Sequence, residues 1–227
     1  MKRIWAFLPF ALVGGVHLAS LAVADATVSG PTKIILMPAL LLAVLLCLPL
    51  RRGLVALGVG AAIAFSWAGD VLLSNPAEVG FLLGLGAFLL AHAAYLVVFL
   101  GPLRTRRIPW LAFVLLALWW GALVAVLLPS IGALFLPVAV YGFVLAASAA
   151  AALGTSRLIA IGALLFLASD TMLALRLFLP GFAMWQADFV IMLAYIAGQG
   201  LIGYGVIVQS RARADDREAS VLVTSGR

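Results

Sequence analysis

The stretches AFSWAGDVLL (residues 64–73) and LLFLASDTML (residues 164–173) each place an aspartate inside an apolar run, Asp70 in the first and Asp170 in the second. The two aspartates lie 100 residues apart, and each is followed 25 residues later by a tyrosine. A carboxylate at the centre of a membrane helix costs about 2.5–3.5 kcal/mol on insertion scales, so it usually faces a bundle interior or a wet cavity. Two carboxylates at matching positions therefore predict one shared polar site between two halves of a membrane protein.

Composition assigns the whole chain to the membrane proteins. Of 227 residues, 66% are hydrophobic and 10% charged, and the mean hydropathy is +1.25. A soluble domain of this composition could not cover its own surface with polar side chains. No long polar stretch marks a second domain, so we predict a single transmembrane domain over residues 1–210. Charged and small residues alternate over residues 211–227, which predicts a disordered cytoplasmic tail.

Apolar runs of about 20 residues, the length that crosses a bilayer, predict an all-α fold of eight transmembrane helices. The predicted ranges are 4–24, 33–50, 53–74, 79–101, 109–128, 131–152, 157–179 and 188–209. The fifth and sixth ranges are divided at Leu128-Pro129-Ser130-Ile131-Gly132, because the run from Pro109 to Leu153 is too long for one crossing. The connections are short, which predicts that consecutive helices are antiparallel neighbours in a polytopic bundle.

The basic residues indicate how the bundle is oriented. When Lys and Arg are assigned to alternate sides of the eight spans, 12 fall on one side and only Lys33 and Arg176 on the other. The positive-inside rule then predicts that both termini are cytoplasmic. The net charge of +6 therefore reflects topology, and we expect no nucleic-acid partner. Residues 1–24 also resemble a secretory signal with a cleavage site after Ala24, although the apolar stretch is long for one.

Further matched spacings predict an internal repeat that extends beyond the aspartates. Tyr95 and Tyr195 share the 100-residue offset, and Pro38 and Pro137 are separated by 99 residues. Spans three and four would then correspond to spans seven and eight. Four spans per repeat is an even number, so the two halves would be parallel and related by an axis along the membrane normal. Coincidence of these spacings is the alternative.

Few other polar side chains lie inside the predicted spans. His92 and Tyr95, three residues apart, share a helix face, as do Tyr195 and Gln199, four apart. Lys33 opens the second predicted span from the outer side, where a long side chain can reach a headgroup. Each residue also has a structural interpretation, as interhelical hydrogen-bonding, packing or anchoring groups. His92 and the two aspartates lack the usual spacing of metal ligands, so we expect no metal.

Several of these residues fall in motifs that resemble the YhhN-like membrane proteins, a family that includes the lysoplasmalogenases. The resemblance covers about residues 5–208. It rests on TKIILMP (residues 32–38), GDVLL (69–73), FLLGLGAFLLAHAAY (81–95), GALLFLASDTMLA (162–174) and AYIAGQGLIGYG (194–205). One departure is Ile34, where the family pattern leads us to expect proline after the lysine.

The resemblance implies an eight-helix membrane hydrolase without a cofactor. Its implied activity is cleavage of the vinyl ether bond of lysoplasmalogens, which yields a fatty aldehyde and glycerophosphoethanolamine or glycerophosphocholine. The implied partner is a lysophospholipid within the bilayer. Asp70 and Asp170 match the family's aspartates. The other polar motif positions are matched by His92, Tyr95, Tyr195 and Gln199.

The chemistry of vinyl ether cleavage suits two carboxyl groups. Protonation of the β carbon generates an oxocarbenium ion, to which water adds, and the resulting hemiacetal collapses. One proton donor and one carboxylate suffice, as in glycoside hydrolysis. We expect the deeper Asp170 to donate the proton and Asp70 to act as base or cation stabiliser. The expected substrate-binding residues, which orient water, substrate oxygens and the phosphate, are Lys33, His92, Tyr95, Tyr195 and Gln199.

Two other function classes fit the same residues. A small proton-coupled transporter also uses intramembrane carboxylates and helices interrupted by Gly and Pro. A lipid-binding membrane protein without turnover is the third possibility. The Ala- and Leu-rich composition, with many Arg and few Lys, is typical of a high-GC bacterium and predicts the inner membrane as location.

Overall fold

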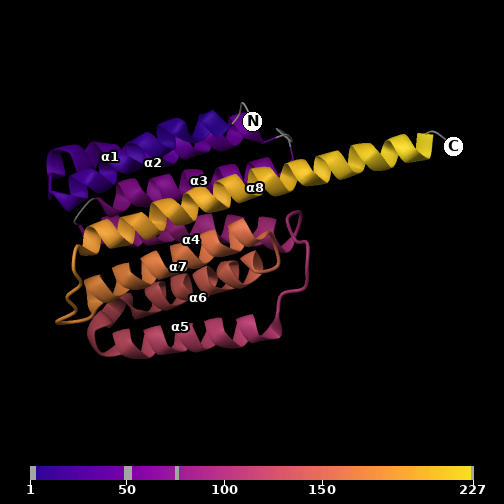
Figure 1. Ribbon diagram of the computed structural model, residues 1–227. Coiled ribbons are helices and arrows are strands. Elements are labelled where there is room, and N and C mark those ends of the chain that lie inside the picture. The colour runs from indigo at the N-terminus through magenta and orange to yellow at the C-terminus, as the bar shows by residue number, and fades with distance from the viewer. Residues whose placement is uncertain (1–3, 49–52, 75–76, 226–227) are drawn as a thin grey trace.

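The computed structural model describes residues 4–48, 53–74 and 77–225, and within these segments all regular structure is helical (Figure 1). A 3-10 turn (Ile4–Phe7) precedes the first α-helix. The α-helices are α1 (Leu8–Ala22), α2 (Ala26–Cys47), α3 (Leu54–Leu73), α4 (Glu78–Leu100), α5 (Trp110–Ile131), α6 (Phe135–Ala152), α7 (Arg157–Phe178) and α8 (Ala187–Ser225). They run side by side as one bundle.

Seven stretches of the described residues are long and apolar enough to cross a membrane, which makes this a multi-pass membrane protein. One stretch, Trp110–Ala152, takes in both α5 and α6. Within it the chain reverses at Gly132, whose φ of +57° lies in the left-handed region that glycine adopts without steric strain. The reversal falls at the predicted boundary, and α5 and α6 consequently lie side by side in Figure 1.

The second helix begins earlier than predicted, at Ala26 instead of residue 33. Asp25 caps its N-terminus, because its Oδ1 accepts hydrogen bonds from the Thr27 backbone N at 3.0 Å and the Thr27 hydroxyl at 2.6 Å. The prediction that Lys33 opens this helix is therefore wrong. Lys33 lies about two turns after the start of α2, at a depth in the bundle where its side chain reaches Asp70 of α3.

The last helix continues where we predicted a disordered tail. α8 extends to Ser225, so residues 211–225 are helical and project beyond the other helices (Figure 1). Alanine, arginine and glutamate in this segment favour helix, and no proline or glycine interrupts it before Ser225. Arg211 donates to the Cys47 carbonyl at 3.0 Å and Arg213 to the Arg104 carbonyl at 2.7 Å. These bonds attach the start of the projecting segment to the end of α2 and to the loop that follows α4.

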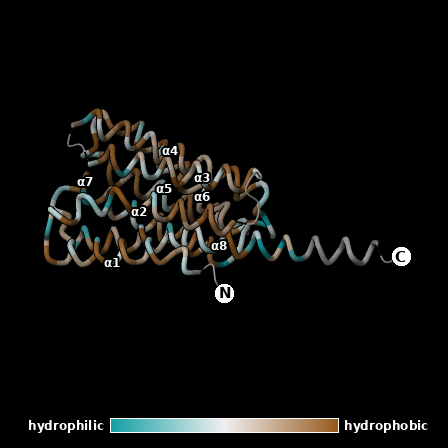
Figure 2. The backbone as a smooth tube through the Cα atoms, turned by 90° about the horizontal axis from the view of Figure 1, so that it is seen from above, coloured by the Kyte–Doolittle hydropathy of each residue, from teal (hydrophilic) through white to brown (hydrophobic). Residues whose placement is uncertain are grey.

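The described arginines gather mainly at the end of the bundle near both termini. Those at this end are Arg104, Arg106, Arg107, Arg157, Arg211 and Arg213, with Arg217 further along α8, whereas Arg176 lies in the last turn of α7. Gln209 links the loops there, since its amide donates to the Leu103 carbonyl and accepts from the Ser156 backbone N at 2.9 Å. Figure 2 shows the hydrophobic length of the bundle between hydrophilic ends. Some of the basic residues on which the predicted orientation rests lie outside the described residues, namely Lys2, Arg3, Arg51, Arg52 and Arg227. The orientation of the bundle in the membrane therefore stays a prediction.

Two helix pairs pack closely, α3 with α4 and α7 with α8. A Cβ atom on Gly162 would lie 2.7 Å from the carbonyl oxygen of Gly198, so the backbones of α7 and α8 approach directly. In the other pair, a Cβ on Gly69 would lie 2.5 Å from the Phe88 ring. The two prolines that the predicted repeat would match do not occupy equivalent positions. Pro38 lies inside α2, whereas Pro137 is the third residue of α6. The four-plus-four repeat therefore stays a prediction.

Candidate functional site

A cavity of about 260 Å³ opens between the helices near the end of the bundle that is remote from both termini. Side chains from every described α-helix except α5 line it. Most of the lining is apolar. The polar and charged lining residues are His17, Ser29, Lys33, Asp70, Tyr141, Ser169, Asp170, Asp188 and Tyr195. The structure thus brings together both predicted aspartates, Lys33 and Tyr195, from α2, α3, α7 and α8.

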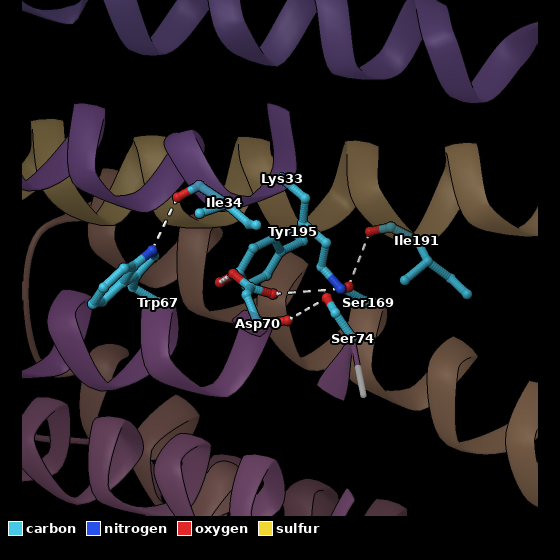
Figure 3. A network of polar contacts seen from close by, with 8 residues as sticks. All are labelled: Lys33, Ile34, Trp67, Asp70, Ser74, Ser169, Ile191 and Tyr195. Atoms are coloured by element: carbon cyan, nitrogen blue, oxygen red, sulfur yellow. Dashed lines mark hydrogen bonds and ion pairs between the residues drawn. The ribbon is translucent and has the colours of Figure 1, made fainter. Parts of the chain in front are cut away.

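Asp70 is held at this cavity by groups from two other helices (Figure 3). It lies three residues before the end of α3 and is 5% exposed. The hydroxyl of Tyr195 donates to its Oδ2 at 2.7 Å, and the Nζ of Lys33 lies 4.0 Å from its Oδ1. The Ser74 hydroxyl donates to the Asp70 carbonyl at 2.8 Å and so completes the helix end. Asp70 therefore has a cation and a neutral donor beside its carboxylate.

Pro38 leaves one backbone carbonyl next to Lys33 without its partner in α2, and a tryptophan of α3 bonds to it instead. Pro38 has no N–H, so it cannot supply the hydrogen bond that the Ile34 carbonyl, four residues earlier, would accept within α2. The indole Nε1 of Trp67 donates to that carbonyl at 2.9 Å, as Figure 3 shows. This bond joins α2 to α3 one residue from Lys33 and one turn from Asp70. The lysine and the aspartate are therefore positioned by the same interhelical contact.

Asp170 meets a different environment. It lies eight residues before the end of α7, and it accepts a hydrogen bond from the hydroxyl of Tyr141 on α6. Within the described part of the chain, no cation lies within ion-pair distance of it. The neighbouring Ser169 donates to the Ile191 carbonyl of α8 at 2.9 Å. Tyr141 and Ser169 were not among the predicted site residues, although both are polar side chains inside apolar spans.

The other predicted residues form a second polar layer behind the cavity. The hydroxyl of Tyr95 donates to Gln199 Oε1 at 2.7 Å, and the Gln199 amide donates to the Ser66 hydroxyl at 3.0 Å. His92 Nδ1 lies 2.9 Å from the Ser148 hydroxyl. All three predicted residues are buried, and none is among the described residues that line the cavity.

Aromatic rings separate the two layers. Phe88 and Tyr195 line the cavity, and both pack edge-to-face on Phe166, with ring centroids 6.2 and 5.2 Å away. On its other side Phe166 contacts the His92 ring at a centroid distance of 4.6 Å. Tyr195 carries its ring in this aromatic wall and its hydroxyl in the cavity. It is therefore the residue through which the buried layer can position Asp70.

The mouth of the cavity carries an ion pair between Arg176 and Asp188, whose side chains are 38% and 60% exposed. Within the described residues, no cluster of three or more His, Cys, Asp or Glu side chains could hold a metal ion. The lining thus includes two carboxyls with unlike neighbours, Asp70 and Asp170, and the ammonium of Lys33 paired with the first of them. Such a set can donate a proton, accept a proton and bind an anion.

Residues 29–206 match the YhhN family. No curated protein matches this chain, and no solved structure does. The matched segment begins inside α2 and ends inside α8, so it includes Lys33, both aspartates and Tyr195 but leaves α1 outside. The YhhN family is associated with hydrolase activity. The match covers well over half of the 227 residues, and the chain therefore belongs to the YhhN family of membrane proteins.

Proposed function

We propose that this protein is a membrane hydrolase that cleaves the vinyl ether bond of lysoplasmalogens. The observation that carries the proposal is that Asp70 of α3 and Asp170 of α7 line one largely apolar cavity beside a single lysine. A lysophospholipid has one anionic phosphate, one reactive bond and one long chain. The cavity offers a cation, two carboxyls and apolar walls in which that chain can lie.

The unlike surroundings of the two aspartates support a division of roles. Asp70 faces the Lys33 ammonium at 4.0 Å and accepts from Tyr195, and both contacts favour a carboxylate. Asp170 accepts only from Tyr141 and has no cation beside it in the described structure. A lone carboxylate is expensive in hydrocarbon, so we assign Asp170 as the neutral acid that donates a proton.

The proposed reaction uses the two carboxyls in turn. Asp170 transfers its proton to the β carbon of the vinyl ether, and the electron pair of the double bond forms the new C–H bond. The ether oxygen then shares its lone pair with the α carbon as an oxocarbenium ion. Water adds to this carbon while Asp70 accepts one of its protons, which gives a hemiacetal.

Collapse of the hemiacetal restores both groups. Asp70 returns its proton to the departing glycerol oxygen as the C–O bond breaks. The hemiacetal hydroxyl gives its proton to Asp170 and becomes the carbonyl oxygen of the aldehyde. The sum is one water consumed, one fatty aldehyde and one glycerophospho compound released, with the protein unchanged.

The remaining predicted residues act around this pair. We assign Lys33 to the substrate phosphate, because it is the cation of the cavity wall next to Asp70. Tyr195 orients the Asp70 carboxylate directly. His92, Tyr95 and Gln199 lie behind the aromatic wall, and in this proposal they hold α4 and α8 so that Tyr195 keeps its place.

We also propose that the eight helices all span the inner membrane of a bacterium, with both termini in the cytoplasm. The cavity then opens at the outer face, because it lies at the end of the bundle remote from the termini. Labelling of a cysteine introduced at Asp188 by a membrane-impermeant thiol reagent in intact spheroplasts tests this orientation. Labelling only after lysis would reverse it.

Aldehyde release by the detergent-purified protein tests the function. We expect release from a 1-alkenyl lysophospholipid and none from the matching 1-alkyl ether, whose saturated chain has no double bond that could accept a proton at the β carbon. Absence of release from the alkenyl lipid would refute the hydrolase. Accumulation of an unchanged solute in sealed vesicles would instead support a proton-coupled transporter.

A further inference from the structure

The part of the cavity wall that α8 contributes is one continuous face of that helix. Four residues of α8 line the cavity at helical spacing, namely Asp188, Ile191, Met192 and Tyr195. Tyr195 bonds to Asp70 at one end of this face. Asp188 lies at the other end, in the first turn of α8 at the mouth of the cavity. The proposed reaction uses Tyr195 and gives Asp188 no role.

The carboxylate of Asp188 has one oxygen available to a ligand. Arg176, in the last turn of α7, donates to its Oδ1. Among the described residues, no donor bonds to its Oδ2. The helix dipole favours an acid in the first turn of a helix whichever way its side chain points, so the dipole alone does not explain why Asp188 lines the cavity. A carboxylate in that position can bind the cationic part of a molecule that fills the cavity.

The register of two helices gives the distance from Asp188 to the reacting carboxyls. Seven residues separate Asp188 from Tyr195 along α8, which corresponds to about 10 Å of helix. Six residues separate Arg176, the ion-pair partner of Asp188, from Asp170 along α7, which corresponds to about 9 Å. Asp188 therefore lies about 10 Å nearer the mouth than the place where the two aspartates act.

The headgroup of an ethanolamine lysoplasmalogen has the same length. Nine bonds join its vinyl ether oxygen to the nitrogen of its ethanolamine. An extended chain advances about 3.3–3.6 Å for every three bonds, so nine bonds span about 10–11 Å. The phosphate lies between these two atoms, five bonds from the ether oxygen. Lys33 beside Asp70 and Asp188 at the mouth thus follow one another in the order in which phosphate and ammonium follow the glycerol.

We propose that Asp188 binds the ammonium group of the substrate headgroup and thereby selects zwitterionic lysolipids over lysolipids whose headgroup carries no cation. This inference rests on the proposed function, because it takes the vinyl ether to lie at Asp70 and Asp170. The ammonium contacts Oδ2 of Asp188, while Arg176 keeps its bond to Oδ1. The Asp188 side chain is 60% exposed, so water screens the attraction and the selection is modest.

Binding of lipids that cannot be cleaved tests this inference separately from the reaction. The probes are a saturated 1-alkyl lysophosphoethanolamine and the same lipid with a phosphopropyl headgroup, in which a methyl group replaces the ammonium. We expect the wild type in uncharged detergent to bind the phosphoethanolamine lipid about three- to fivefold more tightly, the size of one exposed ion pair. Asp188→Asn, which keeps the size of the side chain and removes its charge, should lose this preference. Asp188→Lys should reverse it.

An acidic residue outside the cavity provides the matched control. Glu78 is also exposed and lies in the first turn of its helix, α4, but it is not among the described residues that line the cavity. Glu78→Gln should keep the wild-type preference, and the unfolding midpoint in detergent checks that each variant is folded.

The outcomes separate the role of Asp188 from the hydrolase. Equal binding of the two lipids by the wild type, an unchanged preference in Asp188→Asn, or an equal loss of preference in Glu78→Gln overturns the inference. Aldehyde release by a wild type that binds both lipids equally would refute only the role of Asp188. The expected preference and its loss in Asp188→Asn, without aldehyde release by the wild type, would refute only the hydrolase.

Discussion

Asp70 and Asp170 occupy matching positions in the sequence but have different charged and hydrogen-bonding neighbours in the cavity. Asp70 has Lys33 at 4.0 Å and a hydrogen bond from Tyr195. Asp170 has a hydrogen bond from Tyr141 and no cation within ion-pair distance among the described residues. Two aspartates with matching spacing in the sequence are thus unlike chemical groups, because α2 contributes a lysine beside Asp70 alone.

This asymmetry is what acid-base chemistry requires. Two carboxyl groups of identical surroundings would compete for one proton, whereas unlike surroundings allow one group to hold it and the other to receive it. The cation also makes the two sides of the cavity electrostatically different, since an anionic headgroup is attracted to the side that carries Lys33. The comparison of the two aspartates can therefore be tested by removing each neighbour in turn.

The largest effect is expected when either carboxyl loses its ability to exchange a proton. Asp70→Asn and Asp170→Asn should each lower kcat for aldehyde release at least about a thousandfold, because in the proposed reaction each carboxyl acts both before and after the hemiacetal forms. Turnover by the purified variants measures this. Glu78→Gln, an exposed carboxylate at the start of α4, is the matched control and should retain activity. Full activity in either cavity variant would remove that aspartate from the mechanism.

Removal of the cation should have the next largest effect. Lys33→Met should lower kcat/KM by about 10- to 100-fold, since the substrate phosphate loses a charged partner. The comparison substrate is a 1-alkenyl glycerol without phosphate, for which the variant and the wild type should differ less. An equal loss with both substrates would show that Lys33 serves Asp70 alone. Arg176→Met, which removes the exposed cation of the mouth, should change kcat/KM little.

Variants of the two tyrosines test the contribution of each aspartate's hydrogen bond separately. Tyr195→Phe and Tyr141→Phe each remove one hydroxyl that donates to one carboxyl. We expect each to lower kcat about tenfold while KM changes little, because the lost bond orients a reacting group and does not contact the lipid chain. The double variant should lose activity close to the product of the two, since the bonds serve different carboxyls. A double variant no worse than either single one would mean that the two hydroxyls act on one carboxyl.

The convergence of the two aspartates was predictable, and their partners were not. Matched carboxylates in apolar runs predict a shared interior site, and both do line one cavity. The sequence repeat pairs each aspartate with the tyrosine 25 residues later. The structure pairs Asp70 with Tyr195 of α8 and Asp170 with Tyr141 of α6. Spacing along the chain cannot distinguish these pairings, because they depend on which helices pack together.

Errors in the prediction have local physical causes. The start of α2 was placed at Lys33 because apolar runs were read from charge to charge, but the Asp25 cap starts the helix at Ala26. The tail from residue 211 was predicted to be disordered because charged and small residues alternate in it, whereas α8 continues through it to Ser225 and already provides the helix nucleus. His17 was not among the predicted site residues, although it lines the cavity. Its place in the cavity depends on how α1 packs against α2.

The smallest effect on turnover is expected at the glycines that set the two helix pairs. In Gly162→Ala the new Cβ would meet the Gly198 carbonyl at 2.7 Å, and backbone cannot yield, so α7 and α8 must separate. We expect a loss of about 1–3 kcal/mol in the free energy of unfolding, measured by thermal unfolding in detergent, with modest loss of activity. In Gly69→Ala the obstacle is the Phe88 ring, a side chain that can shift, so stability should fall less. Gly86→Ala, where no atom lies within 4 Å, should not destabilise the protein. If Gly69→Ala proved as destabilising as Gly162→Ala, the α3–α4 crossing would be as rigid as the α7–α8 crossing. The two aspartates would then differ in their neighbours but not in the stiffness of the helices that carry them.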